Sequence, residues 1–81
     1  PHAEAAGMDF VTQLADELAK DALKAERELD DDRLIDQLSN TLKASSMTLQ
    51  EAFMTSVRIR RSEIAGRKWL EARIAKAKSG D

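Results

Sequence analysis

The chain has 81 residues, a net charge of −2 and 42% apolar residues, so it forms one small domain near the lower size limit for a single apolar core. It has no cysteine, which excludes disulfides, thiolate zinc sites and cysteine nucleophiles. No apolar run approaches the roughly 20 residues needed to span a bilayer, and nothing resembles the apolar segment of a secretory signal. We therefore expect a soluble protein of the cytoplasm, although the sequence itself does not define a compartment.

The composition favours helices throughout. Charged residues make up 35% of the chain, with one proline, at position 1, and three glycines, so strand and turn formers are scarce. We predict an all-α fold, either a three-helix antiparallel bundle or a long helical hairpin, with a long basic C-terminal helix. Residues 1–7 are set apart as a tag remnant or a disordered segment, and residues 8–81 are expected to form a single helical domain.

The two halves of the chain carry opposite charge. Residues 1–51 contain five Lys/Arg and twelve Asp/Glu, whereas residues 52–81 contain eight Lys/Arg and three Asp/Glu. Such asymmetry is typical either of an interaction tail or of two halves that pack against one another. We interpret it as self-complementarity, within the fold or in a dimer.

An amphipathic helix is expected from Asp9, a suitable N-terminal cap, to Leu29. At about 100° per residue, its apolar side chains fall within one arc of roughly 140°. Leu23 lies outside this arc, either as an isolated exposed leucine or as part of a second contact. The arc comprises Phe10, Val11, Leu14, Ala15, Leu18, Ala22, Ala25 and Leu29.

Three adjacent aspartates at positions 30–32 are interpreted as a solvated turn and helix start rather than as a metal site. A second helix is predicted from Asp32 to Ser45. Its apolar residues form one narrow face: Leu34, Ile35, Leu38 and Leu42. If the first helix simply continued, this face would lie about 150° from the first arc. A break near Asp31 is therefore favoured over one long helix with two faces.

The longest element is a strongly basic helix from Thr48 to Lys78. It opens with the spacing of a capping box, in which Thr48 accepts a backbone N–H and Glu51 reaches back. At 1.5 Å per residue it is roughly 45 Å long, against about 30 Å and 20 Å for the first and second helices. Its C-terminal third is therefore expected to project beyond them. Its apolar arc of roughly 160° contains Leu49, Ala52, Phe53, Val57, Ile59, Ile64, Leu70, Ile74 and Ala77.

Charged side chains and a glycine interrupt this arc. Four residues at spacings of three and four are expected to form ion pairs along the helix: Arg60, Glu63, Arg67 and Glu71. Gly66 costs up to about 1 kcal/mol of helix stability relative to alanine. It indicates either the close approach of another helix, which we favour, or a kink.

Trp69, the only tryptophan, lies opposite the apolar arc if the helix is unbroken. Small residues and cations share its face, a composition typical of an interface anchor and compatible with the stacking of nucleic-acid bases. If the helix bends at Gly66, Trp69 instead belongs to the core.

Motifs for catalysis, metal binding or phosphate binding are not found. The only histidine, His2, lies in the segment set apart above, and the chain has no glycine-rich loop and no Glu-x-x-His pattern. We therefore expect no enzymatic activity, no cofactor and no metal site.

The sequence predicts a protein–protein interaction module: a homo-oligomer, adaptor, chaperone or assembly subunit that docks through the C-terminal half of its third helix. Its partner would be a second copy or another protein. The alternative is a nucleic-acid-binding module that uses the Arg58–Lys78 surface, but its cations are spread around the helix and the pI is about 5.4. The residues expected to contact a partner are Arg58, Trp69, Leu70, Arg73, Ile74, Lys76 and Ala77.

Overall fold

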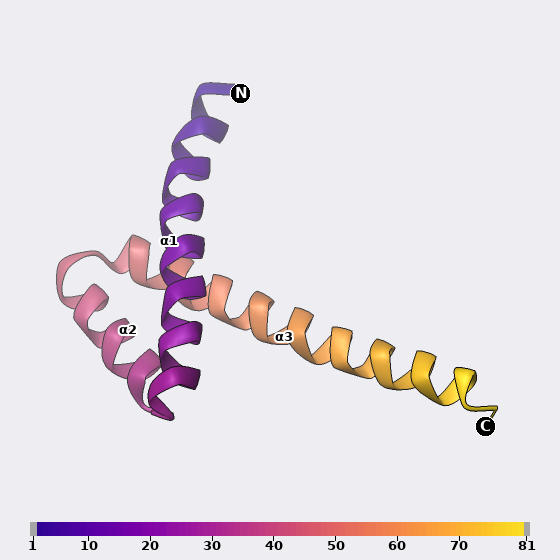
Figure 1. The fold of residues 1–81 in the computed structure, drawn as a ribbon. Helices are drawn as coiled ribbons and strands as arrows, with labels where there is room; N and C mark the ends of the chain where they lie inside the picture. The colour runs from indigo at the N-terminus through magenta and orange to yellow at the C-terminus, as the bar shows by residue number, and fades with distance from the viewer. Residues whose placement is uncertain (1, 81) are drawn as a thin grey trace.

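Residues 2–80 fold into three helices, with no strand among them (Figure 1). The computed structural model describes the backbone of residues 2–80 and the side chains of residues 10–80. Helix α1 spans His2–Leu29, α2 spans Leu34–Ser45 and α3 spans Met47–Lys78. The all-α fold of three helices with a long C-terminal helix is therefore confirmed.

Helix α1 begins at His2, upstream of Asp9, where the sequence predicted its start. Its backbone thus includes residues 2–7, the greater part of the segment that the sequence analysis set apart. The expected cap at Asp9 concerns a side chain outside those that the structure describes, and Pro1 lies outside the described residues altogether.

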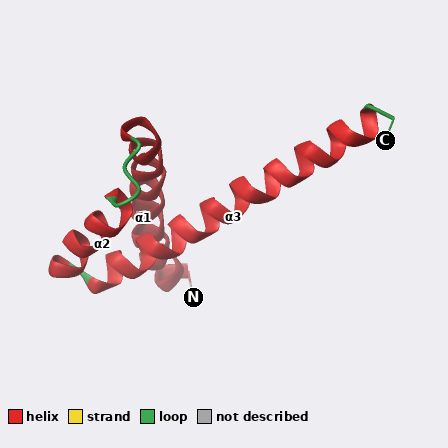
Figure 2. Cartoon of the chain, turned by 90° about the horizontal axis from the view of Figure 1, so that it is seen from below, coloured by secondary structure: helices red, strands yellow, loops and turns green. Residues whose placement is uncertain are grey.

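The helices meet near one end of the molecule. In Figure 1, α3 crosses α1 at a steep angle, and α2 packs against both helices beside that crossing. Beyond the crossing, α3 projects away from α1 and α2, and Figure 2 shows the same projection from a perpendicular direction. The overhang predicted from the unequal helix lengths is confirmed.

The core lies at the crossing of α1 and α3. Ala15, Ala19 and Ala22 form a stripe of small, buried side chains on α1, and their size allows α3 to approach closely. Phe53 and Val57 of α3 are completely buried in the same cluster. Leu23 and Ile35 complete it, with Leu18, Leu34, Leu38, Leu42, Leu49, Ala52 and Met54 packed against its edge.

The buried face of α1 is rotated relative to the predicted one. Phe10, Leu14 and Leu29 were expected in the core but are 62%, 44% and 67% exposed, whereas Leu23 is buried. The reason is that α3 packs over the alanine stripe, where two backbones approach more closely than over bulky side chains. Leu23 follows Ala19 by one helical turn and so lies on that stripe.

The aspartate run forms the turn between α1 and α2. Asp30 is left-handed (φ 50°), and the N–H groups of Asp30 and Asp31 donate to the carbonyls of Arg27 and Glu26 at 3.3 and 3.1 Å. This pair of hydrogen bonds is a Schellman motif, which ends a helix. The carboxylate of Asp31 then accepts the N–H of Arg33 at 3.0 Å. The predicted turn is confirmed, and the alternative of one continuous helix is wrong.

Ser46 alone connects α2 to α3. Its backbone is extended (φ −157°, ψ 105°), its N–H donates to the Leu42 carbonyl at 2.7 Å, and its hydroxyl accepts the Leu49 N–H at 3.1 Å. One residue therefore closes α2 and opens α3. The prediction that Thr48 caps α3 is wrong, because α3 begins at Met47 and Thr48 lies within its first turn.

A side-chain hydrogen bond also joins α2 to α3. Gln50 Nε2 donates to the hydroxyl of Ser39 at 2.8 Å, and Ser39 is buried on the inner face of α2. Among the side chains described, no buried nitrogen or oxygen is left without a hydrogen-bond partner. The small core is therefore polar in places without leaving buried groups unsatisfied.

Replacing the cap should destabilise the fold, and the two candidate caps are readily compared. We expect Ser46→Ala to lower the free energy of unfolding by about 1 kcal/mol, because the Leu49 N–H loses its acceptor. Thr48→Ala, the matched control, should be neutral or slightly stabilising, because alanine is the better helix former. Urea denaturation followed by circular dichroism measures both. A larger loss in Thr48→Ala would contradict the assignment.

Candidate interaction surface

The second half of α3 is not covered by any other described part of the chain. Every residue from Arg61 to Lys78 is exposed, a segment of about 27 Å at 1.5 Å per residue. An isolated helix of this length is only marginally stable in water, and most helical stability in proteins comes from packing of an apolar face. We call this segment the overhang.

All seven residues predicted to contact a partner are exposed on α3, and six of them lie in the overhang; Arg58 precedes it by three residues. Trp69 is 68% exposed, and α3 continues through Gly66 as one helix. The alternative in which Trp69 belongs to the core after a bend at Gly66 is therefore wrong for the single chain.

These seven residues divide between two faces of the helix. At about 100° per residue, Leu70, Ile74 and Ala77 share one face, Arg58, Trp69 and Lys76 share a second, and Arg73 lies between them. The structure therefore brings the apolar residues together, but it separates them from Trp69 by about a quarter of the helix circumference.

Two residues that the prediction did not include extend the apolar face. Ile59 is 63% exposed although the arc analysis grouped it with the core, and Gly66 lies between Ile59 and Leu70 on the same face. Spacings of three and four residues were the signal that connects them. We call this face the seam, and its members are Ile59, Glu63, Gly66, Leu70, Arg73, Ile74 and Ala77.

Gly66 leaves an open place in the seam. A Cβ atom added at Gly66 would meet no side chain and no other helix within 4 Å. The close approach of a second helix, which the glycine suggested, is therefore not made within this chain. The cost of glycine in a helix interior is not offset by any contact in the single chain.

Ion pairs fix α3 to α1 where the overhang begins. Arg60 donates from Nε and Nη2 to Oδ1 and Oδ2 of Asp16 at 2.7 and 2.8 Å, and Arg61 Nη2 donates to Glu26 Oε2 at 3.1 Å. Both pairs join the acidic half of the sequence to its basic half. Part of the charge asymmetry is thus complemented within the fold, as expected.

The two hydrogen bonds between Arg60 and Asp16 shift the pKa of both side chains. Donation by Arg60 lowers the pKa of Asp16 below its ordinary value, and the same bonds raise the pKa of Arg60. Arg60 was expected to pair with Glu63, and that expectation is wrong because its guanidinium reaches Asp16 instead. Along the overhang, Arg67 donates to Glu63 at 2.6 and 2.9 Å, as expected.

The basic surface is smaller than the sequence suggested. Of the eight Lys/Arg residues from Arg58 onward, Arg60, Arg61 and Arg67 are held in ion pairs. The others lie in several directions around the helix axis: Arg58, Lys68, Arg73, Lys76 and Lys78. No continuous basic track results from this arrangement, which disfavours a footprint along a phosphate backbone.

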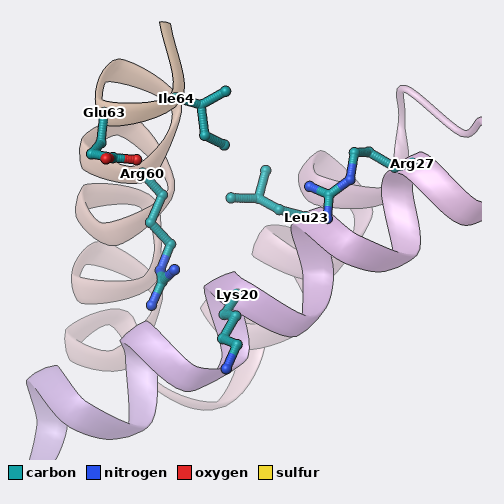
Figure 3. Close-up of a pocket in the computed structure, with 6 residues that line it drawn as sticks. All are labelled: Lys20, Leu23, Arg27, Arg60, Glu63 and Ile64. Carbon is teal, nitrogen blue, oxygen red and sulfur yellow. The ribbon is translucent and has the colours of Figure 1, made fainter. Parts of the chain in front are cut away.

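A groove of about 180 Å³ lies between α1 and α3 where α3 leaves the core. Figure 3 shows Leu23 and Ile64 pointing toward one another across it, with cationic side chains nearby. Its lining consists of Lys20, Leu23, Arg27, Arg60, Glu63 and Ile64. The guanidinium of Arg60 is already paired with Asp16. The groove is therefore a small surface of apolar and charged side chains on the side of α3 that faces α1.

Comparison of the chain with protein-family models, with curated proteins and with solved structures finds no match. Among the described residues, no group of three or more His, Cys, Asp or Glu side chains is suited to hold a metal ion. Within the same part of the chain, no helix has both the length and the apolar character needed to cross a membrane. The candidate surface is therefore defined by geometry alone, as the exposed half of α3.

The Asp16–Arg60 pair should make stability depend on acid. Because the pKa of Asp16 is lowered in the folded chain, its stabilisation is complete above the unfolded pKa, about 3.9, and is lost as the pH falls through the folded pKa. Both side chains are partly exposed, so we expect Asp16→Asn to cost less than about 1 kcal/mol at pH 7. Urea denaturation at pH 7 and pH 2 measures this difference, which should be smaller at the lower pH.

Asp21→Asn is the matched control, since Asp21 is exposed on the same helix and belongs to none of the three ion pairs that the described part of the chain contains. A pH dependence equal in the two variants would contradict a specific role for Asp16.

Proposed function

We propose that this chain is a protein–protein interaction module that docks a protein partner through the overhang of α3. The observation that carries the proposal is the exposure of Trp69, Leu70 and Ile74, at 68%, 49% and 45%, on a helical segment that no other described part of the chain covers. Leu70 and Ile74 share one face and Trp69 lies on the neighbouring face, and exposed apolar groups with a polar rim are typical of interaction sites. A homo-oligomer, an adaptor, a chaperone and an assembly subunit would all use such a surface.

The firm attachment of the overhang to the core supports this proposal. Phe53 and Val57 bury the first half of α3 in the core, and the ion pairs of Arg60 and Arg61 hold it where it leaves α1. The second half therefore projects in one direction rather than swinging on a flexible loop. A surface that is ordered before binding loses less entropy when it docks.

The balance of side chains favours a protein over a nucleic acid as the partner. Three of the eight basic residues are already paired with carboxylates, and Glu63 and Glu71 place negative charge in the overhang itself. Phosphate backbones are bound by unpaired cations, whereas protein interfaces combine an apolar centre with a charged rim. The seam has the second composition.

Photocrosslinking tests the proposal directly. A photoreactive phenylalanine analogue at Ile74, within the full chain expressed in its native cell, should give protein adducts that resist nuclease. The same analogue at Asn40, exposed on α2, is the matched control and should give few or none. Adducts that disappear with nuclease would instead establish the nucleic-acid alternative. Equal labelling at Asn40, or no adduct at Ile74, would overturn docking through the overhang.

Trp69→Ala should separate binding from folding. Trp69 is two-thirds exposed, so we expect the free energy of unfolding to change by less than about 0.5 kcal/mol. As an interface anchor it should weaken partner binding by about 2 kcal/mol, roughly thirtyfold. Thermal melting measures the change in stability. Titration with the partner that photocrosslinking identifies measures the change in binding affinity. A large loss of stability with unchanged binding would show that Trp69 is structural.

A further inference from the structure

We propose that the partner is a second copy of this chain, paired antiparallel along the seam, with the two-fold axis passing the seam at the level of position 68. This inference rests on the proposed function, since it names the occupant of the same surface. A closed dimer uses one self-complementary patch on both copies, so each seam residue must face a suitable residue of the same seam.

The order of residues along the seam meets that condition. In an antiparallel pair centred on position 68, a residue faces the one that lies equally far on the other side of the centre. Gly66 and Leu70 are each two residues from the centre, Glu63 and Arg73 are five away, and Ile59 and Ala77 are nine away. Each pair thus joins a residue to its complement in the second copy.

The central pair matches in size. Leu70 is half exposed and needs cover, while Gly66 has empty space where its side chain would be. In the pair, Leu70 of each copy lies over Gly66 of the other, which lets the two backbones approach closely. Ile59 opposite Ala77 repeats the combination of a large and a small residue at both ends of the seam.

The next pair matches in charge. Glu63 faces Arg73 of the second copy, so two opposite charges meet on each side of the axis. Glu63 already accepts hydrogen bonds from Arg67, and its carboxylate has lone pairs for a further donor. Arg73 takes part in none of the three ion pairs found among the described side chains.

Other registers lose these matches. A parallel pair would set Glu63 against Glu63 and Arg73 against Arg73, and would leave two glycines facing one another. Sliding the antiparallel pair by one helical turn places Glu63 beside Ala77 and Arg73 beside Arg67. Residues 62–80 contain five Lys/Arg and two Asp/Glu, so two overhangs repel one another unless specific pairs offset their charge. The register centred on position 68 is the one that does so.

A charge exchange tests the pairing. Glu63→Arg alone and Arg73→Glu alone should each raise the dimer dissociation constant at least tenfold, because each sets like charges together twice. Mixed in equal amounts, the two variants should recover the dimer, since every contact then joins opposite charges. The double variant should recover it as well. Lys68→Glu, which makes the same charge change as Arg73→Glu on the opposite face, is the matched control and should leave assembly nearly unchanged.

Gly66→Leu provides a second, independent variant. In the single chain the new side chain meets open space and helix propensity rises, so helical content should be kept or increased. In the dimer it occupies the place of Leu70 from the second copy, so assembly should be lost. Mass from light scattering and helicity from circular dichroism report the two effects. A dimer that survives both Gly66→Leu and the charge variants would overturn pairing along the seam.

Different results would contradict the proposal that the partner is a second copy and the proposal that the overhang docks a protein. If the wild-type chain stays monomeric at high micromolar concentration while the analogue at Ile74 cross-links a different protein, the second copy is wrong and the docking function stands. If it is monomeric and Ile74 gives no adduct, both are wrong. Adducts at Ile74 of twice the chain mass, lost in Glu63→Arg and recovered on mixing with Arg73→Glu, establish both.

Discussion

The close approach of α1 and α3 is the constraint on which the rest of the structure depends. Alanines at positions 15, 19 and 22 leave room for Phe53 and Val57, and the two helices cross steeply over that small contact. A steep crossing is short, so only about the first four turns of α3 are covered. The sequence predicts how long α3 is. The steep crossing explains why the second half of α3 has no helix packed against it.

The ion pairs divide α3 into two parts with different electrostatic roles. Arg60 and Arg61 meet Asp16 and Glu26 at the edge of the core, where partial exposure makes each pair weak but two pairs set the direction of the helix. Among the side chains that the structure describes, the remaining cations of α3 have no such partners on α1 or α2. The opposite charges of the two halves are thus paired where α3 leaves the core. Along the overhang, the basic charge is not offset by acidic residues of α1 or α2 that the structure describes.

Local patterns predicted the helices better than they predicted their contacts. The three helices, the break near Asp31 and the overhang follow from periodicity, turn chemistry and length. The sequence pattern indicated only Thr48 as the cap of the third helix, whereas Ser46 caps α3, because Ser46 is the extended residue that links α2 to α3. The apolar arc of α1 counts Phe10 and Ala15 alike, whereas packing buries Ala15, whose small side chain permits close approach, and leaves Phe10 exposed. Arg60 finds its partner 44 residues away, which no local spacing reveals.

Gly66 is the residue for which the sequence and the single chain give different answers. In sequence it indicates close packing, yet in the folded chain it faces open space and only weakens a helix that is already unsupported. Alanine would be the better residue if the overhang served only as a solvent-exposed helix. The glycine becomes favourable when a large side chain such as Leu70 from another helix fills the space above it. In the proposed dimer, Leu70, four residues from Gly66, supplies the side chain that fills this space in the second copy. The overhang is therefore better suited to pairing with a second copy than to exposure as a single helix.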